Sequence, residues 1–105
     1  LWVVPWLRRL DIAQASFQRT EPALRLPRSA SENVRGHLWF TPTTAEPVGW
    51  MIAEAGEDLF LFSSDYPHPE GGRDPLARFE ASLAGATETA KERFYAGNYA
   101  AMMGG

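Results

Sequence analysis

Cysteine is missing from this chain of 105 residues, and its absence excludes disulfide bonds and metal sites built on thiolates. The absence fits a reducing compartment, so we expect a cytoplasmic protein. No apolar run approaches the roughly 18 residues needed to span a membrane, and the first residues lack the basic region of a signal peptide. Because the chain begins with leucine rather than methionine, we also expect it to be a piece of a longer protein.

Basic residues are few and scattered along the chain. Nine arginines and one lysine stand against 13 acidic residues, which gives a net charge of −3. Such a chain lacks the concentrated positive charge that nucleic acids require. We therefore expect neither a nucleic acid nor a membrane as a partner.

Several motifs of enzyme chemistry are also missing. The sequence has no glycine-rich phosphate loop, no Gly-x-Ser-x-Gly elbow and no cysteine nucleophile. Its two histidines, His37 and His68, together with one aspartate would not close a mononuclear metal site, which usually takes three or more protein ligands. If the chain takes part in catalysis, most of the site lies elsewhere.

The residues that are present predict several helices. Pro5 suits the first turn of a helix, and apolar residues recur at helical spacing from Trp2 onward, so we expect a helix over Pro5–Gln18 with Trp2 and Trp6 in the core. The stretch 19–35 reads as a surface connection because its two prolines block a long helix.

Capping residues mark where shorter helices begin. Ser29 or Ser31 could cap a short helical turn, and cap-plus-proline chemistry at Asp74–Pro75 predicts another helix. Thr87 is placed to start one more helix near the end of the chain.

Two short apolar segments predict strands. His37–Thr41 is aromatic, and Leu59–Phe62 is a continuous apolar run that turns polar at once. Between them we expect a helix over Glu46–Ala55, capped by one of the threonines before it and ended by Gly56. This helix is long enough to join two parallel strands by a right-handed crossover, which indicates an α/β fold.

Asp65 is the first candidate for a functional residue. It follows the second predicted strand, and ligands of parallel sheets bind beyond the carboxyl ends of the strands. A carboxylate there could bind a divalent metal ion through one oxygen and accept a proton from metal-bound water through the other. The alternative is an aspartate that caps a helix or belongs to a turn, and the position alone does not separate the two.

His68 is the second candidate. Pro67 and Pro69 fix the backbone around it, which lowers the cost of ordering the loop. A preorganised histidine beside an acid could orient a substrate, donate a hydrogen bond or shuttle a proton, whereas the alternative is a loop histidine bonded to a carbonyl. His37 falls at the start of its predicted strand, and we give it no catalytic role.

The string from Leu61 to Gly71, Leu-Phe-Ser-Ser-Asp-Tyr-Pro-His-Pro-Glu-Gly, resembles the eighth-strand motif of amidohydrolase-related metal-dependent hydrolases. The resemblance is to the branch that contains aminocarboxymuconate-semialdehyde decarboxylase and the dihydroxybenzoate decarboxylases. It covers nearly the whole chain in order. Trp2–Asp11 looks like the helix after the sixth strand, Leu38–Thr41 looks like the seventh strand, and Asn98–Ala101 resembles the Gly-Asn-Ala-Ala turn that ends the catalytic domain.

The resemblance implies a fold and a site. The family fold is a TIM (β/α)8 barrel, and residues 1–105 would be an incomplete C-terminal part with about two parallel strand–helix units plus a preceding helix. Asp65 would bind the divalent metal ion, most often zinc, and accept the proton, while His68 would line the pocket. In the family, the other ligands are histidines on strands outside this chain. We therefore expect that the rest of the barrel is needed and that the isolated chain is inactive.

These features together predict a fragment of a hydrolase of the amidohydrolase superfamily that acts on a small organic substrate and could form a homo-oligomer when full length. The close alternative is a nonoxidative metal-dependent decarboxylase on the same scaffold, since acid, metal and barrel are shared. An alternative of another class is a non-catalytic truncated α/β remnant. The missing ligands favour that alternative, and the intact loop around Asp65 disfavours it.

Overall fold

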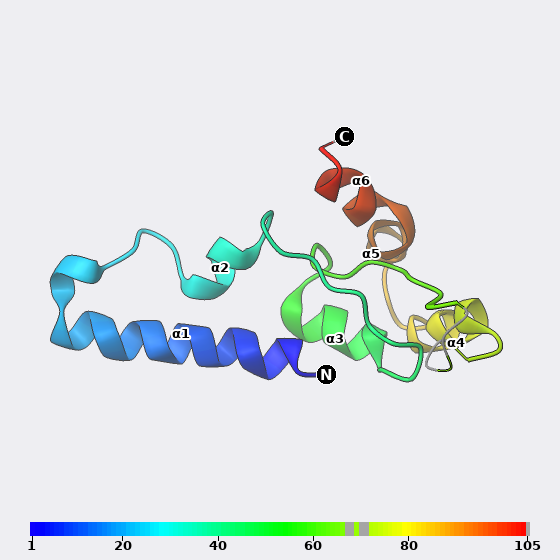
Figure 1. The fold of residues 1–105 in the computed structure, drawn as a ribbon, viewed down its shortest axis with the longest axis horizontal. Coiled ribbons are helices and arrows are strands. Elements are labelled where there is room, and N and C mark those ends of the chain that lie inside the picture. Colours follow the sequence, from blue (N-terminus) through cyan, green and yellow to red (C-terminus); the bar gives the residue numbers. More distant parts are fainter. Residues whose placement is uncertain (67–68, 70–71, 105) are drawn as a thin grey trace.

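The computed structural model describes residues 1–66, 69 and 72–104, and every regular element among them is helical (Figure 1). The elements in chain order are α1 (Val3–Thr20), the 3-10 helix η1 (Pro22–Leu24), α2 (Ala30–Val34), α3 (Val48–Ala55), α4 (Pro75–Ser82), α5 (Glu88–Glu92), the π-helical turn η3 (Arg93–Gly97) and α6 (Asn98–Met102). The molecule measures 51 × 28 × 27 Å, and α1 extends well beyond the other helices in Figure 1. None of the helices in the described part of the chain is long and apolar enough to cross a membrane.

The predicted α/β fold, with parallel strands from a TIM barrel, is wrong for these residues. Neither His37–Thr41 nor Leu59–Phe62 is a strand, and the two segments meet in a single parallel bridge between Phe40 and Phe60. In this bridge the Phe40 N–H donates to the Leu59 carbonyl and the Leu61 N–H donates to the Phe40 carbonyl, each at 2.9 Å. One bridge does not make a sheet.

The opposite edge of the second segment shows why no sheet forms. The carbonyl of Phe60 and the N–H of Phe62 point away from Phe40. These are the groups that a further strand would bind. The side chain of Asn98 donates to the Phe60 carbonyl at 2.9 Å, and the Phe62 N–H donates to the Phe94 carbonyl at 2.9 Å. Residues of the C-terminal helices therefore occupy the place of a neighbouring strand.

The first helix is confirmed and extends beyond Pro5–Gln18 at both ends. Its first turns bury Val3, Val4 and Leu7, whereas its second half is mostly exposed, and Phe17 is 66% exposed. The apolar stripe of α1 is therefore buried in its first turns, where α3 and Val34 of α2 belong to the same core.

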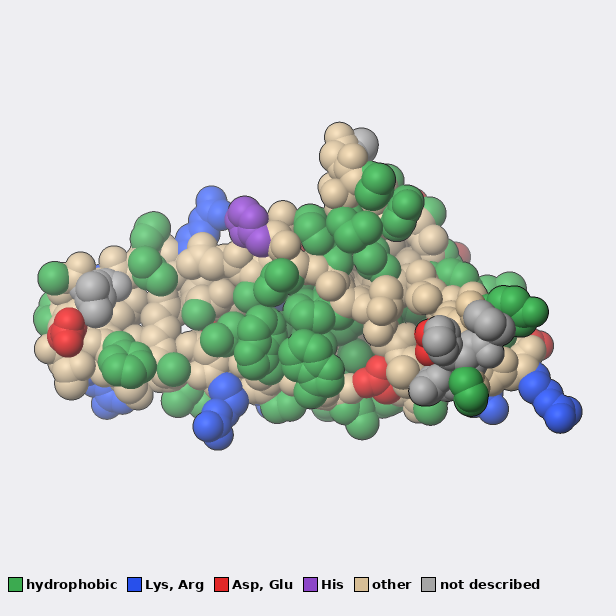
Figure 2. All heavy atoms as spheres, viewed as in Figure 1, with side chains coloured by type: hydrophobic (Ala, Val, Ile, Leu, Met, Phe, Trp, Pro, Cys, Tyr) green, Lys and Arg blue, Asp and Glu red, His purple; other side chains and the backbone are tan. Residues whose placement is uncertain are grey.

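The two tryptophans differ from the prediction that both are core residues. Trp2 is 62% exposed, so its assignment to the core is wrong, while Trp6 is partly buried against the core. Their rings lie 5.8 Å apart and meet Phe40 edge-on at 5.6 and 6.0 Å. Figure 2 shows hydrophobic side chains gathered over the middle of this face of the molecule, where α1 meets α3.

Most capping predictions are confirmed. The side chains of Ser29, Asp74 and Thr87 each accept a backbone N–H from the first turn of the helix that follows. The helix α3 begins later than expected, and its N-cap is Pro47 rather than a threonine. It ends as predicted at Gly56, whose φ of 107° is a conformation that glycine adopts without strain.

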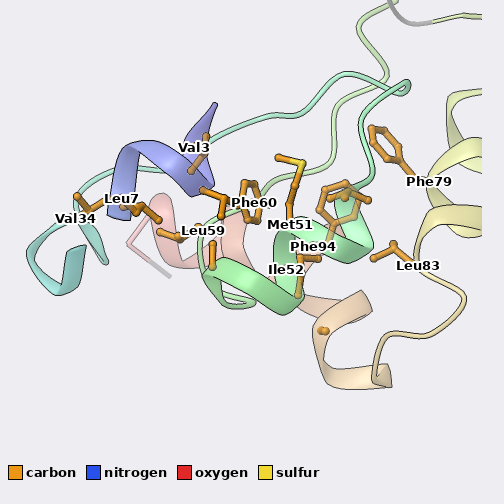
Figure 3. Packing of buried hydrophobic residues seen from close by; sticks show 14 residues of the cluster. Val3, Leu7, Val34, Met51, Ile52, Leu59, Phe60, Phe79, Leu83 and Phe94 are labelled. Carbon is orange, nitrogen blue, oxygen red and sulfur yellow. The ribbon is translucent and has the colours of Figure 1, made fainter. Parts of the chain in front are cut away.

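The core lies where residues of α1, α2, α3, α4, α5 and η3 pack against Leu59 and Phe60, and Figure 3 shows most of them. Seven side chains in it are almost fully buried, and they are Val48, Met51, Leu59, Phe60, Phe79, Leu83 and Phe94. The segment that leads to Asp65 is therefore fixed by packing on one side and by the backbone bonds described above on the other.

Candidate active site

Asp65 lies four residues beyond Leu61, the last buried residue of this segment, and is half-buried. Its φ is 57°, and it is the only residue other than glycine with a positive φ in the described part of the chain. Aspartate tolerates this left-handed region better than most residues, but the conformation still costs free energy. Strain of this kind tends to accumulate at functional sites.

Two serines orient the backbone around this position. The Asp65 N–H donates to the Ser63 hydroxyl and the Tyr66 N–H donates to the Ser64 hydroxyl, each at 3.3 Å. These local bonds turn the chain without using the aspartate side chain.

The carboxylate of Asp65 makes no hydrogen bond or ion pair with any other described residue. Asp74, by contrast, accepts the Ala77 N–H at 3.1 Å as a helix cap. An aspartate in a turn commonly accepts the N–H two residues on, but that residue here is Pro67, which has none. Among the described residues the half-buried Asp65 carboxylate therefore caps no backbone N–H group.

An aromatic cluster supports the approach to Asp65. The ring of Phe62 packs against Phe79 at 5.6 Å, Phe94 at 6.2 Å and Tyr95 at 5.4 Å between ring centres. The contacts with Phe79 and Phe94 are edge-to-face, a geometry that adds stabilisation beyond simple burial. The last apolar residue before the polar stretch is thus held from two helical elements, α4 and η3.

Tyr95 brings a polar group into this cluster. Its hydroxyl oxygen is buried and has no hydrogen-bond partner of good geometry among the described residues. Burial raises the pKa of Tyr95 above its ordinary value, and the negative charge of the nearby Glu80 carboxylate raises it further. Tyr95 therefore stays protonated over the physiological range.

The predicted residues are not brought together as a complete site within the described chain. His68 lies outside the described residues, and His37 is exposed in the turn after α2. In the described part of the chain no group of three or more His, Asp and Glu residues is placed to hold a metal ion. A hollow of about 680 Å³ lies between α3 and α5, but Asp65 does not line it.

Comparison with known proteins finds a similarity in structure. No family model matches the chain, and no curated protein matches it. The chain is similar to the crystal structure of an amidohydrolase from Mycobacterium avium subsp. paratuberculosis K-10. The TM-score is 0.72 at 27% sequence identity, over 92% of this chain and 25% of that chain.

This likeness supports the relationship to the amidohydrolase superfamily that the sequence predicts, at the level of the superfamily and not of one branch. The chain spans a quarter of the length of that amidohydrolase. Activity, substrate and cofactor of the whole protein are therefore matters for proposal.

Sequence reasoning missed two features of the site. It did not predict that the π-helical turn η3 leads without a break into α6. It also gave no role to Asn98, a polar residue only 4% exposed. Asparagine after glycine in an apolar stretch was the available signal, but its partners lie about 40 residues away in the sequence.

Proposed function

We propose that this chain is the C-terminal part of an amidohydrolase-superfamily hydrolase that acts on a small organic substrate. The observation that carries the proposal is the structural similarity to an amidohydrolase over 92% of the chain. It is supported by Asp65, a half-buried acid in a left-handed conformation whose carboxylate has no partner among the described residues.

Asp65 fits a divalent metal ion as one ligand. An aspartate oxygen is one of the ligand types that bind zinc, but the described residues supply no further ligands beside it. We propose that the remaining ligands come from outside this chain. When bound, the metal ion would supply Lewis-acid polarisation of the substrate.

Two residues of this chain, Asp65 and His68, would take part in the reaction. One oxygen of Asp65 would hold the metal ion, and the other would accept a proton during the attack of water. His68 would line the same pocket and orient the substrate or donate a hydrogen bond to it. The Asp65 and Tyr66 N–H groups donate to the Ser63 and Ser64 hydroxyls, so these turn bonds use neither oxygen of the Asp65 carboxylate.

The test uses the full-length protein that carries this sequence, with metal content and steady-state rates as readouts. Asp65→Asn keeps the size of the side chain but removes the proton acceptor, and we expect a loss of about 100-fold or more in turnover. Asp65→Ala should also lower the bound metal, and His68→Ala should reduce turnover with less effect on the metal.

The matched control is Glu88→Gln, which changes an exposed carboxylate on α5 to an amide. It should leave both metal content and turnover unchanged. Full activity in Asp65→Asn would remove the catalytic assignment.

A nonoxidative decarboxylase is the second candidate. It is favoured by the string Leu61–Gly71, which resembles the branch that contains decarboxylases. Both candidates share the acid and the metal, so product analysis decides between them. Release of carbon dioxide without consumption of water would support the decarboxylase.

A further inference from the structure

The buried side chain of Asn98 holds the segment that leads to Asp65 through hydrogen bonds. The Asn98 Nδ2 group donates to the Glu57 carbonyl at 2.8 Å and to the Phe60 carbonyl at 2.9 Å. Asn98 is only 4% exposed, and a buried amide is costly unless it is bonded in this way. Both acceptors are backbone groups, so the bonds fix the path of the chain rather than one side chain.

The π-helical turn before Asn98 supplies a third bond. In a regular α-helix the Asn98 N–H would bond the Phe94 carbonyl, four residues back. Here it bonds the Arg93 carbonyl, five residues back, and the Phe94 carbonyl accepts the Phe62 N–H instead at 2.9 Å. Single π-helical turns of this kind occur frequently at functional sites.

The three bonds hold residues that directly precede the candidate site. The last fastened group is the N–H of Phe62, and the serine-directed turn that presents Asp65 starts at the next residue. On the other edge the same segment is bonded to Phe40. The segment Glu57–Phe62 is therefore held by hydrogen bonds on both of its edges, and Asp65 follows it in the chain.

We propose that Asn98 is a positioning residue for Asp65. By holding the Glu57 and Phe60 carbonyls it sets where the segment ends and therefore where the carboxylate is placed relative to the metal and substrate. This inference rests on the proposed function of Asp65. A displacement of about 1 Å at a reacting group can cost up to about 100-fold in rate, so a remote amide can control turnover without touching substrate.

The test is Asn98→Ser in the full-length protein, assayed well below its melting temperature. A serine hydroxyl is shorter and has one proton to donate, so it cannot reproduce both bonds. We expect kcat to fall about 10- to 100-fold, KM to change less than about threefold, and the Phe62 amide to exchange its hydrogen faster. The matched control, Asn33→Ser on the exposed side of α2, should leave all three quantities unchanged.

A second background keeps the test decisive if Asn98→Ser folds poorly. Gly85→Ala adds a methyl group into open space and stabilises by restricting the unfolded chain, so the pair of changes can be assayed together against Gly85→Ala alone. Wild-type kcat with only a lower melting temperature, in whichever background folds, overturns the positioning role. Full activity in Asp65→Asn overturns the proposed function instead, so the two failures are distinguishable.

Discussion

Gly49 on α3 lies so close to Ser82 at the end of α4 that a Cβ atom at Gly49 would overlap the Ser82 carbonyl oxygen. The two residues are also joined by a hydrogen bond from the Gly49 N–H to the Ser82 hydroxyl at 3.0 Å. The obstacle is backbone, which cannot move aside without shifting α4. The close approach of α3 and α4 therefore requires glycine at this position.

Gly49→Ala should accordingly destabilise the protein by about 2–4 kcal/mol, as overpacking against a rigid neighbour does. Gly85→Ala is the control, because its added Cβ meets nothing within 4 Å. Urea unfolding of the two variants beside wild type measures the difference. Equal stability of Gly49→Ala and Gly85→Ala would contradict the helix contact.

Phe79 tests the aromatic cluster beneath the site. Its side chain has no exposed surface and packs against Phe62 and Phe94. Phe79→Ala should cost about 3–5 kcal/mol through lost burial and the cavity left behind. Phe17→Ala, at a 66% exposed position of α1, should change stability by about 0.5 kcal/mol or less. Thermal unfolding followed by circular dichroism separates the two, and a large loss in the Phe17 variant would speak against the exposed end of α1.

The raised pKa of Tyr95 predicts how the stability of the fold changes with pH in the alkaline range. Its pKa is raised in the folded state, first by burial and then by Glu80, so the unfolded chain loses this proton at a lower pH than the folded chain. The unfolded state then binds fewer protons above about pH 10, and stability falls as pH rises beyond that ordinary value. Tyr95→Phe should remove this part of the alkaline loss. Tyr99→Phe, at an exposed tyrosine, should leave it in place, and denaturant midpoints between pH 8 and 11 provide the measurement.

Asp65 should show a conflict between stability and function. Its left-handed φ of 57° is costly for any residue with a Cβ atom. Asp65→Gly should therefore be more stable than Asp65→Ala by about 1 kcal/mol. Both variants lose the carboxylate and should be inactive in the full-length protein. A glycine variant no more stable than the alanine variant would mean that the left-handed backbone at position 65 carries no strain.

The helices could be predicted from the sequence because their signals are local. Asp74 and Thr87 cap the helices that follow them, and Gly56 ends α3, through bonds or conformations within a few residues. The apolar run Leu59–Phe62 was misread because a strand exists only if its edges find strands as partners. One edge finds a single residue, Phe40, and the other finds helical residues instead.

The candidate site was only partly predictable for the same reason. The position of Asp65 after an apolar run indicated a functional acid, but nothing nearby in the sequence indicated its left-handed backbone. The roles of Asn98 and Phe94 depend on groups more than 30 residues earlier in the chain. Such bonds appear only when the chain has folded.

The late position of Asn98 also has a consequence for biosynthesis. The backbone groups of Phe60 and Phe62 that it and Phe94 cover are made first, and they stay uncovered until the C-terminal helices leave the ribosome. At about 5–20 residues per second, that interval is on the order of seconds. During this time the nascent apolar segment is open to pairing with other chains, so the yield of folded protein depends on whatever shields this segment before Phe94 and Asn98 arrive.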